Sequence, residues 1–93
     1  MEDNKKIQTN DLYKIIKREV DKFDAYGLLE VGCPKNEFDM ESKMIFKKLK
    51  KGMTKEQISI VMAETFSEMF GDEFKAERFD KHAEEIEKEL NKI

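Results

Sequence analysis

The chain has 93 residues, of which 39% are apolar and 42% charged, and its formal net charge is −3. This length fits one domain, residues 1–93, and the small negative charge gives no general attraction to nucleic acid or to an anionic membrane. One cysteine excludes an intrachain disulfide framework and a cysteine-based zinc cage, and no apolar run approaches the roughly 20 residues of a membrane span. Residues 1–6 lack the apolar stretch of a secretory signal, so we expect a cytoplasmic location.

The first predicted helix runs to about Phe23 and follows a polar lead, residues 1–8, that we expect to be frayed. Thr9 or Asn10 can cap this helix, because a short side-chain oxygen accepts hydrogen bonds from the first free backbone N–H groups. Apolar residues then recur at helical spacing, and Glu19 is the only polar residue on their face. They are Leu12, Ile15, Ile16, Val20 and Phe23.

Residues 24–35 interrupt this periodicity and predict a long loop. Gly27 is a natural helix stop, because glycine enters the left-handed region without steric cost. Leu28, Leu29 and Val31 are too apolar for a free linker, so the loop is expected to pack back on the body. Twelve residues is a long connection for a small bundle.

The second predicted helix begins at Asn36, and Asp39 provides a partial capping box three residues later. Lys50 and Lys51 place positive charge at its C-terminal end, where the helix dipole favours cations. Gly52 is the expected residue just after the helix.

The third predicted helix has the clearest start signal of the chain. Met53 provides a hydrophobic staple to Ile58, Thr54 is the N-cap and Gln57 occupies the third helical position, which completes a capping box. Gly71 ends this helix.

The fourth predicted helix is capped by Asp72 and keeps the helical period to the end of the chain. Its apolar residues are Phe74, Phe79, Ala83, Ile86 and Leu90. No segment alternates as a strand would. The predicted fold is therefore all-α: a single-domain antiparallel four-helix bundle with a long loop between the first and second helices.

Acidic residues around the loop form the first candidate site: Asp24, Glu30, Glu37 and Asp39. Their spacing matches no EF-hand, so no metal ion is expected. Asp24 and Asp39 are expected to bind backbone N–H groups and hold the loop. Glu30, Glu37 and Asp39 would form an acidic rim around the mouth of the loop, which suits a basic partner.

Two residues with reactive side chains remain without a recognisable catalytic partner. His82 lacks a serine or cysteine at a known spacing and an oriented second group, so we expect a partly exposed helix histidine. Cys33 has Lys35 and a helix start nearby, which would activate a thiol, but a small buried hydrophobe is the simpler interpretation. No catalytic residue and no cofactor are therefore predicted.

The charges of the chain are unevenly distributed. Residues 43–55 carry six lysines and no acid, whereas residues 64–89 carry ten acids against four bases. The basic patch, which could follow a phosphate backbone, comprises Lys43, Lys47, Lys48 and Lys51. It has no arginine and no interleaved aromatic residues, so a solvated helix surface is the simpler interpretation.

Three apolar residues, Met40, Phe46 and Ile60, fall off the best helical stripes. If they lie together in space, they predict a patch for a partner or a second copy of the chain.

Three short runs carry a resemblance to a known family: residues 23–28, residues 36–39 and residues 49–56. The chain resembles the YugE-like proteins, small helical proteins of unknown function from Gram-positive bacteria, over about residues 12–71. The resemblance implies a helical fold and a cytoplasmic setting, and it implies no reaction.

The sequence thus predicts a non-enzymatic protein–protein interaction module, with an immunity or antitoxin-like role as one form of it. Its partner would be an unidentified protein, and a homodimer is a second option. The alternative is nucleic-acid binding through the lysine-rich face of residues 43–55, whose affinity would fall steeply with salt.

Overall fold

The computed structural model describes residues 2–92, and the side chains of residues 11–92, as four α-helices and two short 3₁₀ helices without a strand. The elements are α1 (Glu2–Phe23), η1 (Ala25–Gly27), α2 (Asp39–Lys48), α3 (Lys55–Phe70), η2 (Ala76–Phe79) and α4 (Asp80–Leu90). The all-helical fold class is therefore confirmed for the described part of the chain.

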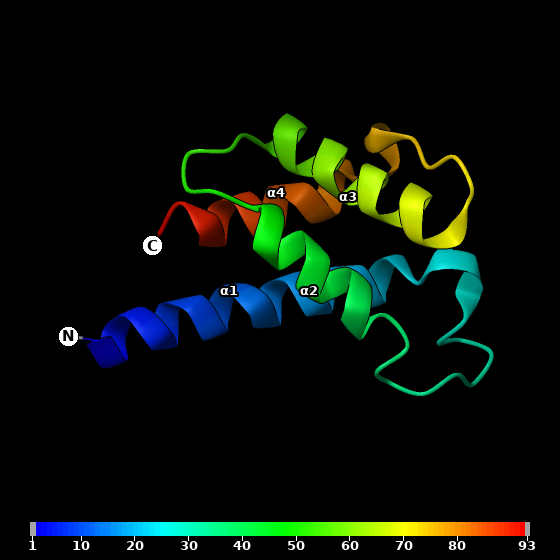
Figure 1. The fold of residues 1–93 in the computed structure, drawn as a ribbon, viewed down its shortest axis with the longest axis horizontal. Helices are drawn as coiled ribbons and strands as arrows, with labels where there is room; N and C mark the ends of the chain where they lie inside the picture. The colour runs from blue at the N-terminus through cyan, green and yellow to red at the C-terminus, as the bar shows by residue number, and fades with distance from the viewer. Residues whose placement is uncertain (1, 93) are drawn as a thin grey trace.

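Each helix packs against two others (Figure 1). The packed pairs are α1 with α2, α2 with α3, α3 with α4, and α4 with α1. In Figure 1, α2 crosses α1 obliquely, and α3 and α4 lie together along the opposite side. One core therefore lies between all four helices.

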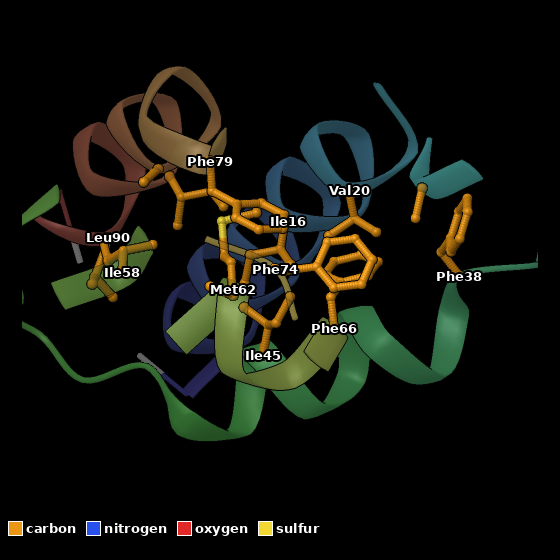
Figure 2. Packing of buried hydrophobic residues seen from close by; sticks show 14 of the residues in the cluster. Ile16, Val20, Phe38, Ile45, Ile58, Met62, Phe66, Phe74, Phe79 and Leu90 are labelled. Carbon is orange, nitrogen blue, oxygen red and sulfur yellow. The ribbon is translucent and has the colours of Figure 1, made fainter. Parts of the chain in front are cut away.

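The core is rich in phenylalanine (Figure 2). Phe38, Phe66 and Phe79 are completely buried. The ring of Phe66 lies 5.5 Å from those of Phe23 and Phe79 and 5.7 Å from those of Phe70 and Phe74. Aromatic rings at such distances add attraction beyond the burial of their area. All four helices contribute to the buried apolar set, which includes Leu12, Ile16, Val20, Ile45, Ile58, Met62, Phe66, Phe74, Phe79, Ala83, Ile86 and Leu90.

The start and end of α3 agree with the prediction. The Thr54 hydroxyl accepts a hydrogen bond from the Gln57 N–H at 3.2 Å, and the Gln57 side chain accepts one from the Thr54 N–H at 2.9 Å. This is the reciprocal capping box expected from the sequence. Gly71 follows the helix in the left-handed conformation, with φ 68°.

The predicted start of the first helix is wrong. α1 begins at Glu2, so Thr9 and Asn10 lie inside the helix instead of capping it. Residues 2–8 contain neither glycine nor proline and include glutamate, lysine and glutamine, all good helix formers. The helix therefore continues through the segment predicted to be a frayed lead.

The predicted bounds of the second helix are also wrong. Residues 34–37 form turns, in which the Pro34 carbonyl accepts from the Glu37 N–H at 3.0 Å, so α2 begins only at Asp39. It ends at Lys48, because Leu49 is extended and packs on the core. Gly52, with φ 96°, belongs to the turn beyond that and does not terminate the helix directly.

Asp72 does not cap the fourth helix, which begins eight residues later. Phe74 and Phe79 are both buried, and residues five apart on one α-helix point about 140° away from each other. A break between them lets both reach the core, and η2 provides it. Asp72 instead accepts a hydrogen bond from the Tyr26 hydroxyl at 2.6 Å.

At the turn before α3, Thr54→Ala should cost about 1 kcal/mol of unfolding free energy through loss of the cap. Gly52→Val should cost more, because φ at Gly52 is 96° and a β-branched residue resists positive φ. Nothing lies within 4 Å of a Cβ built at Gly52, so this cost would come from the backbone alone. Urea melts of both variants and of Gly52→Ala test this; equal stability of the valine and alanine variants would contradict it.

Candidate functional site

The acidic loop rim expected from the sequence is only partly available to a partner. Asp24 is left-handed, with φ 47°, and its carboxylate accepts from the Leu29 N–H at 2.7 Å and the Glu30 N–H at 3.1 Å. Its predicted role in holding the loop is confirmed. Glu30 and Glu37 are exposed and face solvent.

Asp39 is held by a side chain and not by the backbone N–H groups predicted for it. Its Oδ1 atom lies 2.8 Å from the Lys17 Nζ atom, which also reaches Asp21 and the Lys35 carbonyl, each at 3.1 Å. Burial would lower the pKa of Lys17, but the hydrogen bonds to Asp39 and Asp21 outweigh it and raise that pKa above its ordinary value. Lys17 thus fastens α1 to the loop and to the first turn of α2.

These contacts predict different effects for three of the acidic residues around the loop. Asp24→Ala should lower the melting temperature, because it leaves two backbone N–H groups without their acceptor. Glu30→Ala and Glu37→Ala should leave the melt nearly unchanged, because both side chains are exposed. Thermal melts of the three single variants check this, and equal losses in all three would contradict it.

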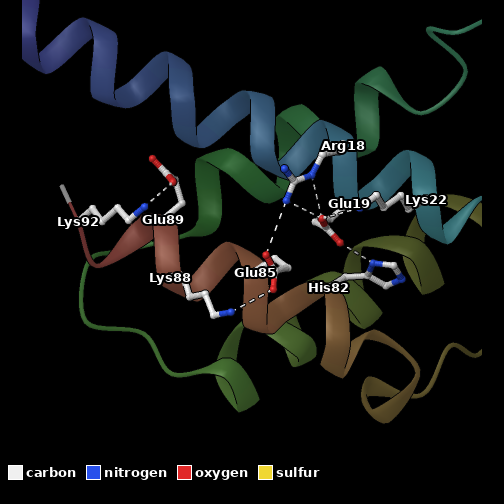
Figure 3. Close-up of polar contacts among 8 residues, drawn as sticks. All are labelled: Arg18, Glu19, Lys22, His82, Glu85, Lys88, Glu89 and Lys92. Atoms are coloured by element: carbon white, nitrogen blue, oxygen red, sulfur yellow. Dashed lines mark hydrogen bonds and ion pairs between the residues drawn. The ribbon is translucent and has the colours of Figure 1, made fainter.

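The structure also holds a carboxylate–histidine pair that the sequence did not predict (Figure 3). Glu19 projects from α1 and is only 3% exposed, and its Oε1 atom lies 2.8 Å from His82 Nδ1 of α4. A carboxylate only accepts hydrogen bonds, so Nδ1 carries the proton and donates it. Arg18 and Lys22 reach the other oxygen at 3.0 and 3.7 Å.

The pKa of Glu19 reflects two opposed effects. Burial raises it, but the hydrogen bonds from His82 and Arg18 and the charge of Lys22 outweigh burial, and the pKa lies below its ordinary value. His82 therefore has the oriented second group that the sequence had not revealed. Because the contact joins helices 63 positions apart in the sequence, its clearest consequence is to fasten α1 to α4.

No metal centre accompanies this pair. Among the described residues, no three histidine, cysteine, aspartate or glutamate side chains gather where they could hold a metal ion. Cys33, the free cysteine, is half-buried in the loop.

An open groove of about 740 Å³ lies along α3. Its lining mixes apolar and charged side chains: Lys48, Ile60, Ala63, Glu64, Ser67, Glu68, Phe74 and Ala76. Ile60 is 49% exposed although it is large and apolar, and Glu64 and Glu68 follow it at four-residue steps on the same face of the helix. The groove therefore presents an apolar side chain next to two carboxylates.

One lysine of the predicted basic patch, Lys48, lies at this groove. Lys43, Lys47, Lys48 and Lys51 are all exposed. Lys48 lines the groove, and its Nζ atom donates to the Thr65 hydroxyl of α3 at 3.3 Å. We call this groove, which extends from Lys48 at the end of α2 along the exposed side of α3, the α2–α3 face.

The three apolar residues off the predicted stripes have different environments. Phe46 is partly buried and packs edge-on against Tyr13, with ring centroids 5.7 Å apart. Met40 and Ile60 are exposed. Ile60 alone was therefore a sequence signal for the groove, whose other lining residues come together only in the fold.

Comparison with known proteins found no matching family model, no matching curated protein and no matching solved structure. The YugE-like resemblance therefore stays a prediction. No helix within residues 2–92 combines the length and the apolar character needed to cross a membrane.

Proposed function

We propose that this protein is a non-enzymatic module that binds another protein chain through its α2–α3 face. The observation that carries the proposal is the open groove of about 740 Å³, in which half-exposed Ile60 lies beside the exposed carboxylates of Glu64 and Glu68. Protein interfaces typically combine an apolar centre with a charged rim.

The chemistry of the groove supports binding over catalysis. Its lining contains neither member of the Glu19–His82 pair and no cysteine. Glu64 and Glu68 lie on an open surface, where water screens their charges, and no histidine lines the groove beside them to exchange a proton.

Nucleic-acid binding through the lysine-rich segment is the weaker alternative. The exposed lysines Lys43, Lys47, Lys48 and Lys51 favour phosphate. Glu64 and Glu68 share the groove with Lys48, however, and would repel a phosphate backbone laid along it.

The proposal also includes predictions made from the sequence about the bundle arrangement, the location, the origin and the role of the chain. An antiparallel bundle is supported by the short connection of residues 49–54 between α2 and α3, and the segment 24–38 would be its long loop. A cytoplasmic location, a bacterial origin and an immunity or antitoxin-like role rest on the sequence and the YugE-like resemblance. Exposed Glu30 and Glu37 would then serve as a secondary contact.

Site-specific photo-crosslinking in the native host tests the proposal. A photoreactive residue at position 60 should give a discrete covalent adduct with a protein chain, because Ile60 lies in the groove. The matched control is position 84, an exposed site on α4. Adducts of equal yield from both positions, or none from position 60, would contradict the proposal.

A further inference from the structure

We infer that the partner chain lays a basic amphipathic helix along the α2–α3 face; this rests on the proposed function above. An apolar side chain of that helix packs on Ile60, and its lysine or arginine side chains lie against Glu64 and Glu68. The occupant is therefore a segment defined by its chemistry, an apolar residue followed by cations at helical spacing.

The first argument is the pattern of side chains on α3, which carries two stripes. One stripe, which includes Ile58, Met62 and Phe66, is completely buried in the core. The other stripe lines the open groove and comprises Ile60, Ala63, Glu64, Ser67 and Glu68. Its members recur at steps of three and four residues, which is the spacing that one helix presents to another packed along it.

The second argument is that the groove is held in shape without a ligand. Lys48 Nζ donates to the Thr65 hydroxyl at 3.3 Å, which fastens the end of α2 to α3. The Phe74 N–H donates to the Ser67 hydroxyl oxygen at 2.9 Å, which fastens the segment after α3 to the same helix. Lys48, Phe74 and Ser67 all line the groove, so a partner meets a surface that is already formed.

The third argument is the charge of the groove. Among residues 11–92, no ion pair joins Glu64 or Glu68 to a lysine, arginine or histidine side chain. Lys48 is the one cation among the lining residues, and its Nζ atom is directed to a hydroxyl. Two carboxylates thus face solvent beside half-exposed Ile60, and a basic partner supplies the charges that they lack.

The acidic character continues beyond the end of α3. Residues 72–77, which supply Phe74 and Ala76 to the groove, carry three exposed acids and one lysine. The guanidinium of Arg78, the next cation, lies over the rings of Phe23 and Phe74, 5.1 and 5.5 Å from their centres. A basic helix that runs past Glu68 therefore stays in acidic surroundings.

The spacing of the groove residues sets the pattern expected in the partner. Ile60, Glu64 and Glu68 follow one another at four-residue steps, about 6 Å each along the helix axis. A second helix with an apolar residue and two cations at the same steps matches all three positions at once. An acidic helix would meet Lys48 alone and would be repelled by both carboxylates.

Photo-crosslinking from position 60 separates this inference from the proposed function. The adduct should map by mass spectrometry to a segment with lysine or arginine at four-residue steps, and Glu64→Lys/Glu68→Lys should lower its yield about tenfold. An adduct that maps to an acidic segment, or whose yield the reversal leaves unchanged, would overturn this inference and leave the proposed function standing. The absence of any adduct would overturn both.

Two synthetic helical peptides make the test quantitative. Both carry the same leucine, which is followed at two four-residue steps by lysines in one peptide and by glutamates in the other. By fluorescence anisotropy, the purified full chain should bind the lysine peptide about tenfold more tightly, and about 500 mM salt should reduce this preference. Equal affinities, or a preference for the glutamate peptide, would overturn the inference.

A charge-reversed variant and a matched control show where the peptide binds. Glu64→Lys/Glu68→Lys should prefer the glutamate peptide, and this reversal also shows that the variant is folded. The control, Asp11→Lys/Glu84→Lys, changes the net charge equally at exposed sites on α1 and α4 and should keep the preference of the parent. Loss of the preference in both variants alike would assign it to net charge and would overturn the inference.

Discussion

Replacing Phe66 with alanine is expected to lower the free energy of unfolding by about 3–5 kcal/mol, as for other large core aromatic residues. Phe66 is completely buried, and its ring lies within 6.1 Å of five other phenylalanine rings, which come from α1, the residue before α2, α3, η2 and the segment before η2. Truncation would leave a cavity among rigid rings that cannot close it. For a domain of 93 residues, this loss is a large part of the total stability.

Urea unfolding followed by circular dichroism measures the effect. The matched control is Ile60→Ala on the same helix, which removes apolar atoms from a half-exposed position and should cost much less. A Phe66→Ala midpoint equal to that of the parent would show that α3 does not carry the centre of the core.

Glu19→Gln is expected to cost about 1–3 kcal/mol at neutral pH and to remove part of the acid sensitivity of the fold. The pKa of Glu19 lies below its ordinary value of 4.5 in the folded protein. At pH values between the folded and the unfolded pKa of Glu19, the unfolded chain binds more protons than the folded one. The stability that Glu19 contributes is therefore complete above about pH 4.5. It is lost as the pH falls through the lower, folded value.

Unfolding free energies measured from neutral pH down to the acid range check the sign and the source of this effect. The parent should lose more stability on acidification than Glu19→Gln does. Glu37→Gln, a change at an exposed carboxylate, should follow the parent. Parallel curves for the parent and Glu19→Gln would contradict the role given to the buried pair.

The elements that were predicted correctly depend on neighbours in the sequence. The capping box of Thr54 and Gln57 and the left-handed Gly71 involve residues at most a few positions apart, so their chemistry can be read from the chain. The start of α4 depends on a tertiary requirement. Phe74 and Phe79 must both enter one core, which local propensity does not reveal.

The candidate sites also divide into signals that are visible within one helix and partners that only the fold brings together. Glu19 stood out as the only polar residue on an apolar stripe, which signals a buried carboxylate that needs a partner. The partner, His82, lies 63 positions away and was found only in the fold. Asp39 likewise was expected to bind the backbone, but the fold brings Lys17 within 2.8 Å of it, and a charge-assisted contact is the stronger one.

The groove could be predicted least of all. Ile60 was visible as an apolar residue off the stripe, and the charges of residues 43–55 and 64–89 were visibly separated. Nothing in the order of the residues placed Lys48 in one groove with Glu64 and Glu68, because that arrangement depends on how α2 packs against α3.

The most direct test of the α2–α3 face as a protein-binding surface is a photo-crosslinking scan of the full chain in its host, with the photoreactive residue placed in turn at exposed positions. Positions 60, 64 and 68, which line the groove, should all give the same discrete adduct with a protein chain. Position 14 on α1 and positions 81 and 84 on α4 should give little or none of it. Adducts confined to α1, to α4 or to the loop of residues 24–37 would contradict the account.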